Sequence, residues 1–367
     1  MSQRPRHITV KPELILDEAK CKCNIQLMKQ RADDAGVIFR PHFKTHQSAV
    51  IGQWFRQAGV HAITVSSVTM AEYFASHGWD DITIAFPVNL LEMNAITKLA
   101  SRINLNLLVE SEEVAVHLGE AGLKAGVFIK IDVGAHRTGI PVHETEIILS
   151  LINTIRQIPS LTLKGFLAHA GHTYKAKGYH EINQIAMDAA NALKAIRLSA
   201  AIPDLLISWG DTPSCSLMTE NPGFDEWRPG NFVFYDVMQY HIGSCSLDQI
   251  AVAMACPVVA THSSRNQVVI YGGAIHFSKE RIMADDNFEL FGYVVEMDEN
   301  GWGQPIPGAW LSSLSQEHGI VTLPESVAGR IKPGMILGIL PIHSCLAVSA
   351  LKEMYTLNGF RVSCMPL

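Results

Sequence analysis

Short apolar runs alternate with amphipathic stretches along roughly the first two thirds of the chain. The runs are mostly apolar rather than alternating, which is typical of strands that are buried on both faces. Helix signals lie between them, such as a capping box at 69–72 and Ser111 followed by Glu112 and Glu113. Eight runs predict strands, at 37–43, 62–66, 82–86, 105–110, 127–133, 163–169, 205–209 and 232–236.

This alternation predicts a parallel sheet, because parallel strands need long crossover connections and the helical stretches supply them. Eight repeats over about 200 residues favour an α/β fold of the (β/α)8 TIM-type barrel class. A doubly wound open sheet shares the same alternation and is the alternative.

Near residue 245 the pattern changes to β-rich segments with turn residues between them. We expect three parts: a lead segment at 1–20 that could join the later β domain, a barrel at 21–245 and a mostly antiparallel β domain at 246–367. The expected strands of the β domain are 252–261, 267–275, 288–297, 310–314 and 335–340.

Composition narrows the class of protein. The 367 residues are 48% hydrophobic and 17% charged, with a formal net charge of −6, so we expect a globular protein without a basic face for nucleic acid. No signal-peptide core opens the chain and no run is long enough to span a membrane, so we expect a cytoplasmic protein with no membrane partner. The seven cysteines show no disulfide-framework spacing and are expected to be reduced thiols.

Lys44 lies where the first predicted strand ends and an amphipathic helix begins. In barrel enzymes this end of the strands carries the chemistry. The neighbouring Arg40, His42 and His46 disfavour an ammonium, which lowers a lysine pKa toward nucleophilic use. Lys44 is therefore a candidate Schiff-base lysine, and a solvated lysine at a helix start is the alternative.

Other polar clusters also follow predicted strands. The segments at 132–139 and 169–174 follow the fifth and sixth strands, and 228–231 precedes the eighth. After the seventh strand, glycine and hydroxyl residues at 210–215 offer the close backbone approach and the donors that a phosphate needs. Taken alone, that segment could be an ordinary turn. Together with Lys44 it indicates pyridoxal phosphate, whose aldehyde needs an amine and whose phosphate needs such a loop.

His343 and Cys345 form a possible metal pair in the expected β domain. We expect them on an extended segment, where residues two apart point to the same side. An imidazole nitrogen and a thiolate could then share a zinc ion, and two protein ligands would leave positions open for water or substrate. The alternative is a buried cysteine beside a core histidine.

Six motifs occur in an order that resembles a known family: RPHxKTH, DVGxxRxG, GH, GDTPS, RPGN with YD, and HxC. The chain resembles eukaryotic-type D-serine dehydratases and D-threonine aldolases, which belong to the alanine-racemase-like, fold type III class of pyridoxal phosphate enzymes. The resemblance covers almost the whole chain. It implies a cofactor-binding barrel, a C-terminal β domain and a homodimer.

The resemblance also implies site residues. Lys44 resembles the lysine that binds the cofactor and exchanges the Cα proton, and Arg137 the arginine that faces the pyridine nitrogen. His172 is a plausible acceptor of the hydroxyl proton. His169 stands where the family commonly has tyrosine, at a position expected to stack on the cofactor ring. The remaining implied residues are Gly210, Thr212, Ser214, Gly230 and Asn231 for the phosphate, and His343 and Cys345 for a divalent metal, expected to be zinc, with manganese or magnesium as alternatives.

The reaction expected from this resemblance is dehydration of a D-3-hydroxy amino acid to a 2-oxo acid and ammonia, because HxC goes with dehydratases in the family. D-serine, D-threonine and D-threo-3-hydroxyaspartate are the candidate substrates, and the basic residues around Lys44 could favour the acidic one. An aldolase giving glycine and an aldehyde is an alternative, as is a racemase that uses Tyr271 or Tyr293. A non-catalytic carrier of the cofactor would not need the metal pair.

Overall fold

The computed structural model describes residues 9–283, 288–298 and 300–366, and residues 1–8 of the predicted lead segment lie outside these ranges. The described chain forms two compact units. The barrel unit contains residues 26–44 and 52–230, and the β unit contains 9–25, 45–51 and the described residues from 231 on. The chain therefore passes between the units after residues 25, 44, 51 and 230.

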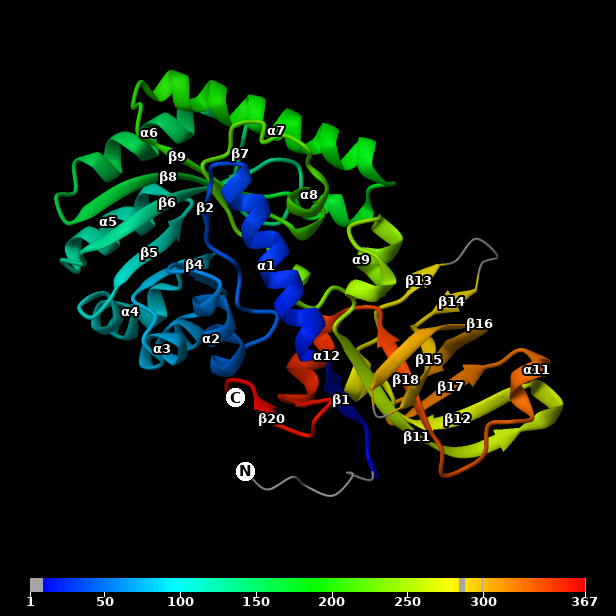
Figure 1. The fold of residues 1–367 in the computed structure, drawn as a ribbon. Coiled ribbons are helices and arrows are strands. Elements are labelled where there is room, and N and C mark those ends of the chain that lie inside the picture. The colour runs from blue at the N-terminus through cyan, green and yellow to red at the C-terminus, as the bar shows by residue number, and fades with distance from the viewer. Residues whose placement is uncertain (1–8, 284–287, 299, 367) are drawn as a thin grey trace. The chain divides into compact units, whose positions relative to one another are not determined.

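The barrel unit, all of whose residues are described, is built on eight parallel strands in the order β2-β10-β9-β8-β6-β5-β4-β3. Figure 1 labels six of them, β2, β4, β5, β6, β8 and β9. A bridge between His42 and Thr64 joins the two ends of this order, with the Phe43 N–H donating to the Thr64 carbonyl at 2.8 Å. The sheet therefore closes, which confirms the predicted barrel and excludes the open doubly wound sheet. The strands are β2 (Ile38–Phe39), β3 (Ile63–Val65), β4 (Asp81–Pro87), β5 (Asn104–Val109), β6 (Ala125–Asp132), β8 (Leu161–His169), β9 (Leu206–Gly210) and β10 (Glu226–Trp227), and β7 (Ile140–Pro141) pairs with β6.

Helices connect these strands where the amphipathic pattern predicts them. Ser111 accepts the Val114 N–H and caps α5, as the sequence indicates. The predicted capping box at 69–72 is wrong by two residues, because Ser67 caps α3 by accepting the Met70 N–H. The helices are α1 (Glu18–Asp34), α2 (Ala49–Gln57), α3 (Val68–Ser76), α4 (Met93–Ala100), α5 (Glu112–Glu120), α6 (Thr145–Arg156), α7 (Tyr179–Ala200) and α8 (Thr212–Leu217).

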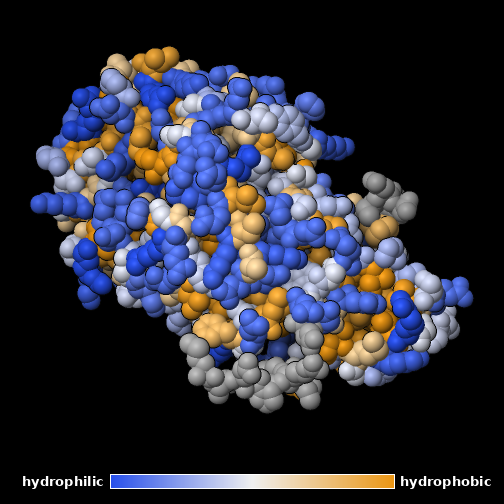
Figure 2. All heavy atoms as spheres, viewed as in Figure 1, coloured by the Kyte–Doolittle hydropathy of each residue, from blue (hydrophilic) through white to orange (hydrophobic). Residues whose placement is uncertain are grey.

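The surface of the molecule is largely polar on the face shown in Figure 2, with apolar residues interspersed. On α1, for example, Lys29 and Asp33 form an exposed ion pair one helical turn apart, at 2.5 Å. Of the described helices, none combines the length and the apolar character needed to cross a membrane.

The eighth strand differs from the prediction. The apolar run at 232–236 is not a strand: η3 (Asn231–Val233) is a buried 3-10 turn, Tyr235 has a φ of +49°, and Asp236 caps α9 (Val237–Ile242). The strand is instead β10, whose Glu226 is fully buried. A buried carboxylate needs partners, and Arg40 Nε at 2.6 Å and Ser208 Oγ at 2.5 Å supply them. Pattern reading missed this strand because tertiary pairing lets a charged residue occupy a core position.

The β unit contains a mostly antiparallel sheet in the order β12-β17-β16-β15-β18-β11-β1-β19-β20. A further pairing of β12 with β11 closes six of these strands into a barrel. The predicted antiparallel β domain is therefore confirmed as a fold. The strands are β1 (Glu13–Leu16), β11 (Val252–His262), β12 (Gln267–Tyr271), β15 (Gly292–Asp298), β16 (Gly301–Leu314), β17 (His318–Thr322), β18 (Ile336–Pro341), β19 (Glu353–Thr356) and β20 (Arg361–Ser363), with β13 (Ile282–Met283) and β14 (Glu289–Leu290) forming a small separate sheet.

Two predictions for the β unit are wrong in detail. The strand expected at 267–275 ends at Tyr271 and is followed by α10 (Ala274–Phe277). The segment expected to be extended at 341–345 instead starts α12 (Ser344–Leu351), with His343 as its N-cap residue. The Asp236 carboxylate accepts the Ser344 N–H at 3.0 Å, and so satisfies one of the donors that a helix start leaves unpaired.

Candidate active site

The carboxyl ends of the barrel strands bring several predicted residues together within the barrel unit. Lys44 lies in the turn that follows β2, and its N–H donates to His42 Nδ1 at 3.3 Å. Its side chain is exposed, and its charge is near enough to contribute to lowering the pKa of His169, at the end of β8. Lys44 and His169 therefore belong to one site.

His169 is held in one orientation. Its Nδ1 donates to the Gly210 carbonyl at the end of β9. Burial is the main cause that lowers its pKa well below the usual value, and the charges of Lys44 and Arg137 add to the effect. The imidazole is therefore neutral, with the proton on Nδ1 and Nε2 left as an acceptor.

Arg137 is presented by the loop after β6. The Asp132 carboxylate accepts the N–H groups of Gly134, Ala135 and His136 at 2.9 to 3.1 Å and so shapes this loop. Burial raises the pKa of Asp132, but these hydrogen bonds outweigh it and the pKa is lowered. Because Arg137 acts on the pKa of His169, the structure brings it to the same region as Lys44.

The segment after β9 fits a phosphate group. Asp211 caps α8 and accepts the Ser214 N–H at 2.6 Å, the Ser214 hydroxyl at 2.8 Å and the Thr173 hydroxyl at 3.1 Å. Burial raises the pKa of Asp211 to about 6. The Thr212 hydroxyl is buried and has no hydrogen-bond partner among the described residues, so it is a donor available to an anionic group. This orphaned donor is the observation that fits the phosphate of pyridoxal phosphate.

Gly210 completes this loop by leaving room for Arg228. A Cβ on Gly210 would lie 3.2 Å from the Cβ, the Nη1 and the carbonyl oxygen of Arg228, which is closer than most Cβ contacts. Gly230 is the last residue of the barrel unit in this stretch. It follows Pro229, whose carbonyl accepts the His42 N–H at 2.8 Å.

Asn231 belongs to the β unit and has different neighbours. Its Nδ2 donates to Asp236 at 2.6 Å and lies 3.3 Å from Ser344 Oγ and 3.6 Å from Cys345 Sγ, while its Oδ1 is buried without a partner among the described residues. These contacts lie around the predicted metal pair. A role for Asn231 at the phosphate stays a prediction.

His172 lies in η2 (Gly171–Lys175) against the loop that carries Arg137. A Cβ on Gly134 would lie 3.4 Å from His172 Cε1, so the imidazole faces that loop. Burial lowers the pKa of His172, and the charge of Asp132 acts against the shift. Its Nδ1 is buried without a partner among the described residues, so this nitrogen is available to a ligand.

His343 and Cys345 meet although their segment is helical. Each side chain shifts the pKa of the other, so the two lie close together, and His343 Nδ1 lies 2.6 Å from Glu280 Oε2. Burial lowers the pKa of His343, but the bonds to Cys345 and Glu280 outweigh it and raise this pKa. Burial raises the pKa of Cys345, but His343 and Thr45 lower it by more. The net pKa is therefore lowered, which favours the thiolate.

This donor set fits a divalent ion. With Nδ1 held by Glu280, Nε2 is the imidazole nitrogen left for a metal, and an imidazole with a thiolate suits zinc. The described residues contain no cluster of three or more histidine, cysteine or acidic side chains arranged to hold a metal, so His343 and Cys345 would be the protein ligands. Two ligands leave positions open for water or substrate.

Comparison with known proteins identifies the family. Residues 16–237 match the family described as "Alanine racemase, N-terminal domain", which is more than half of the chain, and residues 251–357 match "Putative serine dehydratase domain". The chain belongs to the alanine racemase-like family. This membership confirms the predicted enzyme class, a lyase that depends on pyridoxal phosphate.

Three curated relatives span nearly the whole chain. D-threo-3-hydroxyaspartate dehydratase of Delftia sp. (strain HT23) is 30% identical over 91% of the chain and 90% of its own length. D-serine dehydratase of Dictyostelium discoideum is 26% identical over 94% and 92%. D-threonine aldolase of Arthrobacter sp is 25% identical over 90% and 85%.

The solved structure of the Delftia dehydratase has the same fold, with a TM-score of 0.87 at 28% identity over 97% of the chain and 98% of that protein. A cysteine-to-alanine variant of the dehydratase is described as its metal-free form, and a histidine-to-alanine variant is also solved. The two substituted residues are separated by one position, as His343 and Cys345 are in this member of the alanine racemase-like family.

Arg228 is a residue near the site that sequence reasoning left without a role of its own. Its buried guanidinium donates from Nε to Ser208 Oγ at 2.6 Å and from Nη2 to the Ala168 carbonyl at 2.7 Å. Burial lowers its pKa to about 10. Arg228 thus braces the ends of β8 and β9, which carry His169 and Gly210. Its position directly before Pro229 and Gly230 was the available sequence signal.

Two of the basic residues around Lys44 are committed elsewhere. Arg40 donates to Glu226 at 2.6 Å and is paired with Asp81, both inside the barrel unit. His46 is fully buried in the β unit, and burial lowers its pKa to about 3, so it is neutral. The hypothesis that Arg40 and His46 attract an acidic substrate group is therefore wrong. The charge of Arg40 is neutralised by Glu226 and Asp81, and the imidazole of His46 is not protonated.

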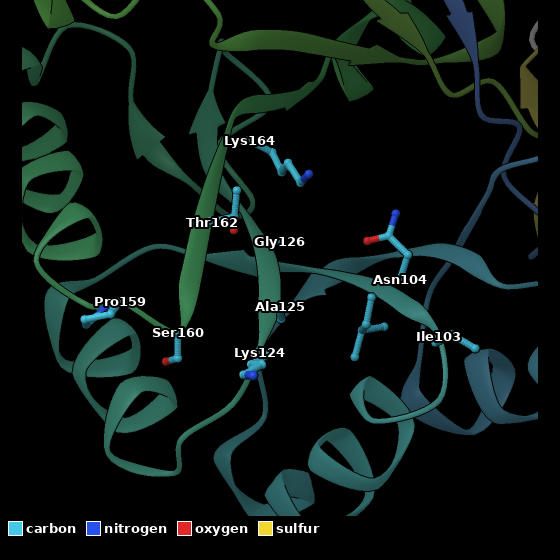
Figure 3. Close-up of a pocket in the computed structure, with 10 residues that line it drawn as sticks. Ile103, Asn104, Lys124, Ala125, Gly126, Pro159, Ser160, Thr162 and Lys164 are labelled. Atoms are coloured by element: carbon cyan, nitrogen blue, oxygen red, sulfur yellow. The ribbon is translucent and has the colours of Figure 1, made fainter.

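A cavity of about 310 Å³ lies at the amino ends of β5, β6 and β8 (Figure 3). Lys124, Ser160 and Lys164 are among its lining residues. The predicted site residues of the family follow the carboxyl ends of the strands, and they do not line this cavity. In a barrel of this class the amino end serves stability, so the cavity is not assigned to the active site.

Proposed function

We propose that this protein is a dehydratase that uses pyridoxal phosphate and a divalent metal to convert a D-3-hydroxy amino acid to a 2-oxo acid and ammonia. D-serine, D-threonine and D-threo-3-hydroxyaspartate are the substrates to test. The observation that carries the proposal is the pairing of the His343 imidazole with the Cys345 thiol, each of which shifts the pKa of the other. The matching His and Cys substitutions in the related Delftia dehydratase, one in a metal-free form, support this assignment.

Lys44 would bind the cofactor and exchange the proton at the substrate Cα through its Nζ. When bound, pyridoxal phosphate supplies the electron sink that makes this proton acidic. Around Lys44, the Thr212 hydroxyl would donate to the phosphate, and the neutral ring of His169 would lie along the cofactor plane. Since the Gly210 carbonyl holds His169 Nδ1, the ring cannot turn freely.

His343 and Cys345 would hold the divalent ion, and zinc is expected from these donors. The ion would supply Lewis-acid polarisation of the substrate β-hydroxyl, which favours its departure. Within the β unit, the Thr45 hydroxyl lies 3.2 Å from Cys345 Sγ and helps to lower the pKa of this thiol. We infer a zinc-dependent elimination in a homodimeric cytoplasmic enzyme.

Racemisation has less support. A tyrosine that acts as a base needs a lowered pKa, but burial raises the pKa of Tyr293 and the neighbouring Tyr240 adds to the effect. The Tyr293 hydroxyl is also hydrogen-bonded to His241 Nε2 at 2.8 Å.

The decisive assay supplies D-serine, D-threonine and D-threo-3-hydroxyaspartate, with and without thorough metal removal. We expect a 2-oxo acid from at least one substrate and its loss without metal. Glycine with an aldehyde would instead establish an aldolase, and turnover unaffected by metal removal would refute the role of His343 and Cys345. The Lys44→Ala variant should no longer trap cofactor on that residue after borohydride reduction.

A further inference from the structure

Glu280 contacts His343 of the proposed metal pair. Its Oε2 lies 2.6 Å from His343 Nδ1, a normal distance for a charge-assisted hydrogen bond. We propose that Glu280 is a positioning residue that orients His343 for the metal. This inference rests on the proposed function, because it needs His343 and Cys345 to be the metal ligands.

The contact fixes both the tautomer and the direction of the imidazole. A carboxylate can only accept, so the proton of the neutral ring is on Nδ1 and the lone pair is on Nε2. The contact with Glu280 uses the Nδ1 side of the ring, which leaves Nε2 as the nitrogen for a metal ion. A carboxylate behind a metal-binding histidine also makes the imidazole a stronger ligand.

The local backbone holds Glu280 in this position. Ser278 has φ +77° and ψ −179°, a conformation that residues with a side chain rarely adopt. Its hydroxyl accepts the Glu280 N–H at 3.2 Å. The Glu280 side chain is 47% exposed, so it adds little to core packing. A strained turn that directs a half-exposed carboxylate at one imidazole is consistent with a role in orienting that imidazole.

The backbone that carries His343 and Cys345 is held by Asp236 rather than by Glu280. Asp236 accepts the Ser344 N–H at 3.0 Å and the Ser344 hydroxyl at 3.2 Å, which holds the backbone at the start of α12. Removal of Glu280 therefore leaves the helix start in place and frees only the His343 ring. The expected effect is on metal affinity and geometry rather than on folding.

The test is zinc affinity, measured by competition with a chromophoric chelator on the full-length protein loaded with pyridoxal phosphate. We expect Glu280→Ala to weaken zinc binding about 10- to 100-fold. Glu280→Gln should lose less, because its amide oxygen still accepts from Nδ1. Glu296→Gln is the matched control, since Glu296 is an exposed carboxylate on β15 of the same unit.

A second readout separates positioning from folding. The thermal midpoint of metal-free Glu280→Ala should equal that of the metal-free wild type, and its cobalt-substituted form should show an altered cobalt–thiolate absorption. Zinc affinity equal to wild type in Glu280→Ala, with weak binding in Cys345→Ala, would overturn the role of Glu280. Wild-type affinity in Cys345→Ala would refute the proposed metal pair itself, and a lowered midpoint in Glu280→Ala would assign Glu280 to folding.

Discussion

At the scale of single residues, the partners of a buried histidine decide its charge. His46 accepts the Ser48 N–H and His169 donates to the Gly210 carbonyl, and burial is the main cause that lowers both pKa values, so both rings are neutral. His343 is also largely enclosed, but Glu280 and Cys345 raise its pKa. The same side chain therefore serves as a neutral flat ring at His46 and His169 and as the partner of a thiolate at His343.

Asp211 gives a pH-dependent prediction at this scale. Burial raises its pKa in the folded state to about 6, above the ordinary value of 3.8, so the folded state binds this proton more tightly than the unfolded state. The free energy of unfolding should fall as pH rises through this window, by about 2 to 3 kcal/mol from this group. In cofactor-free protein, Asp211→Asn should remove this part of the pH dependence, measured by urea unfolding between pH 4 and 7. The prediction would be contradicted if the free energy of unfolding changed with pH in the same way in the wild type and in Asp211→Asn.

Asp132 gives a second residue-scale prediction. Its carboxylate accepts three backbone N–H groups in the loop that carries Arg137. Asp132→Ala should lower the free energy of unfolding by about 1 to 2 kcal/mol and weaken cofactor binding, because three backbone donors lose a charged acceptor. Urea unfolding and titration with pyridoxal phosphate would measure both. Asp132→Asn keeps an acceptor oxygen, so it should lose less stability and less cofactor affinity than Asp132→Ala. Wild-type values of both quantities in Asp132→Ala would disprove the prediction.

At the scale of elements, one carboxylate fixes two helix starts in the β unit. Asp236 accepts the Gln239 N–H of α9 at 3.0 Å and the Ser344 N–H of α12 at 3.0 Å. Asn231 Nδ2 donates to the same side chain at 2.6 Å. Since α12 carries Cys345, the cap of α9 also sets the position of the proposed metal pair.

Asp236→Ala should therefore lower the free energy of unfolding by about 3 kcal/mol or more, because several buried donors lose a charged acceptor at once. Zinc affinity should fall with it. Asp236→Asn, which keeps an acceptor oxygen, should lose less in both measurements, by denaturant unfolding and by chelator competition. Loss of stability without loss of zinc affinity would separate the helix cap from the metal pair.

The elements also show what could be predicted from sequence and what could not. The sequence predicts strands with mostly apolar runs, such as β6 and β8. It also predicts the position of Lys44, which follows β2, the first strand of the barrel. β10 was missed because its Glu226 is buried by pairing with Arg40, a partner 186 positions away. The helix at Ser344 was missed because Asp236, 108 positions away, supplies its cap. Glu280 gave no local signal, since nothing near it in sequence marks its contact with His343.

At the scale of the whole molecule, the barrel has a partly polar interior. Leu108, Phe128 and Leu167 form an apolar cluster, while Arg40, Ser208 and Glu226 form a buried polar network with Arg228. Charged groups at these positions must be paired to be tolerated. This network joins β2, β9 and β10, so the closing strands of the barrel depend on ion pairs as well as on backbone bonds.

Glu226→Gln should therefore lower the free energy of unfolding by about 3 to 5 kcal/mol, because it leaves buried guanidinium groups without their carboxylate. The double variant Arg40→Met with Glu226→Leu should be more stable than Glu226→Gln, since it removes both charges. Urea unfolding of the three proteins provides the comparison. A double variant less stable than the single one would show that the pair contributes more than charge compensation.

The segment at 45–51 has a consequence for synthesis of the protein on the ribosome. The carbonyl of Gln47 accepts the Met365 N–H at 2.6 Å, and its side chain accepts from Lys352, 305 positions later. At a translation rate of about 5 to 20 residues per second, roughly 15 to 60 s pass before these partners exist. The segment that follows Lys44 therefore gains these two partners only when synthesis of the chain is almost complete.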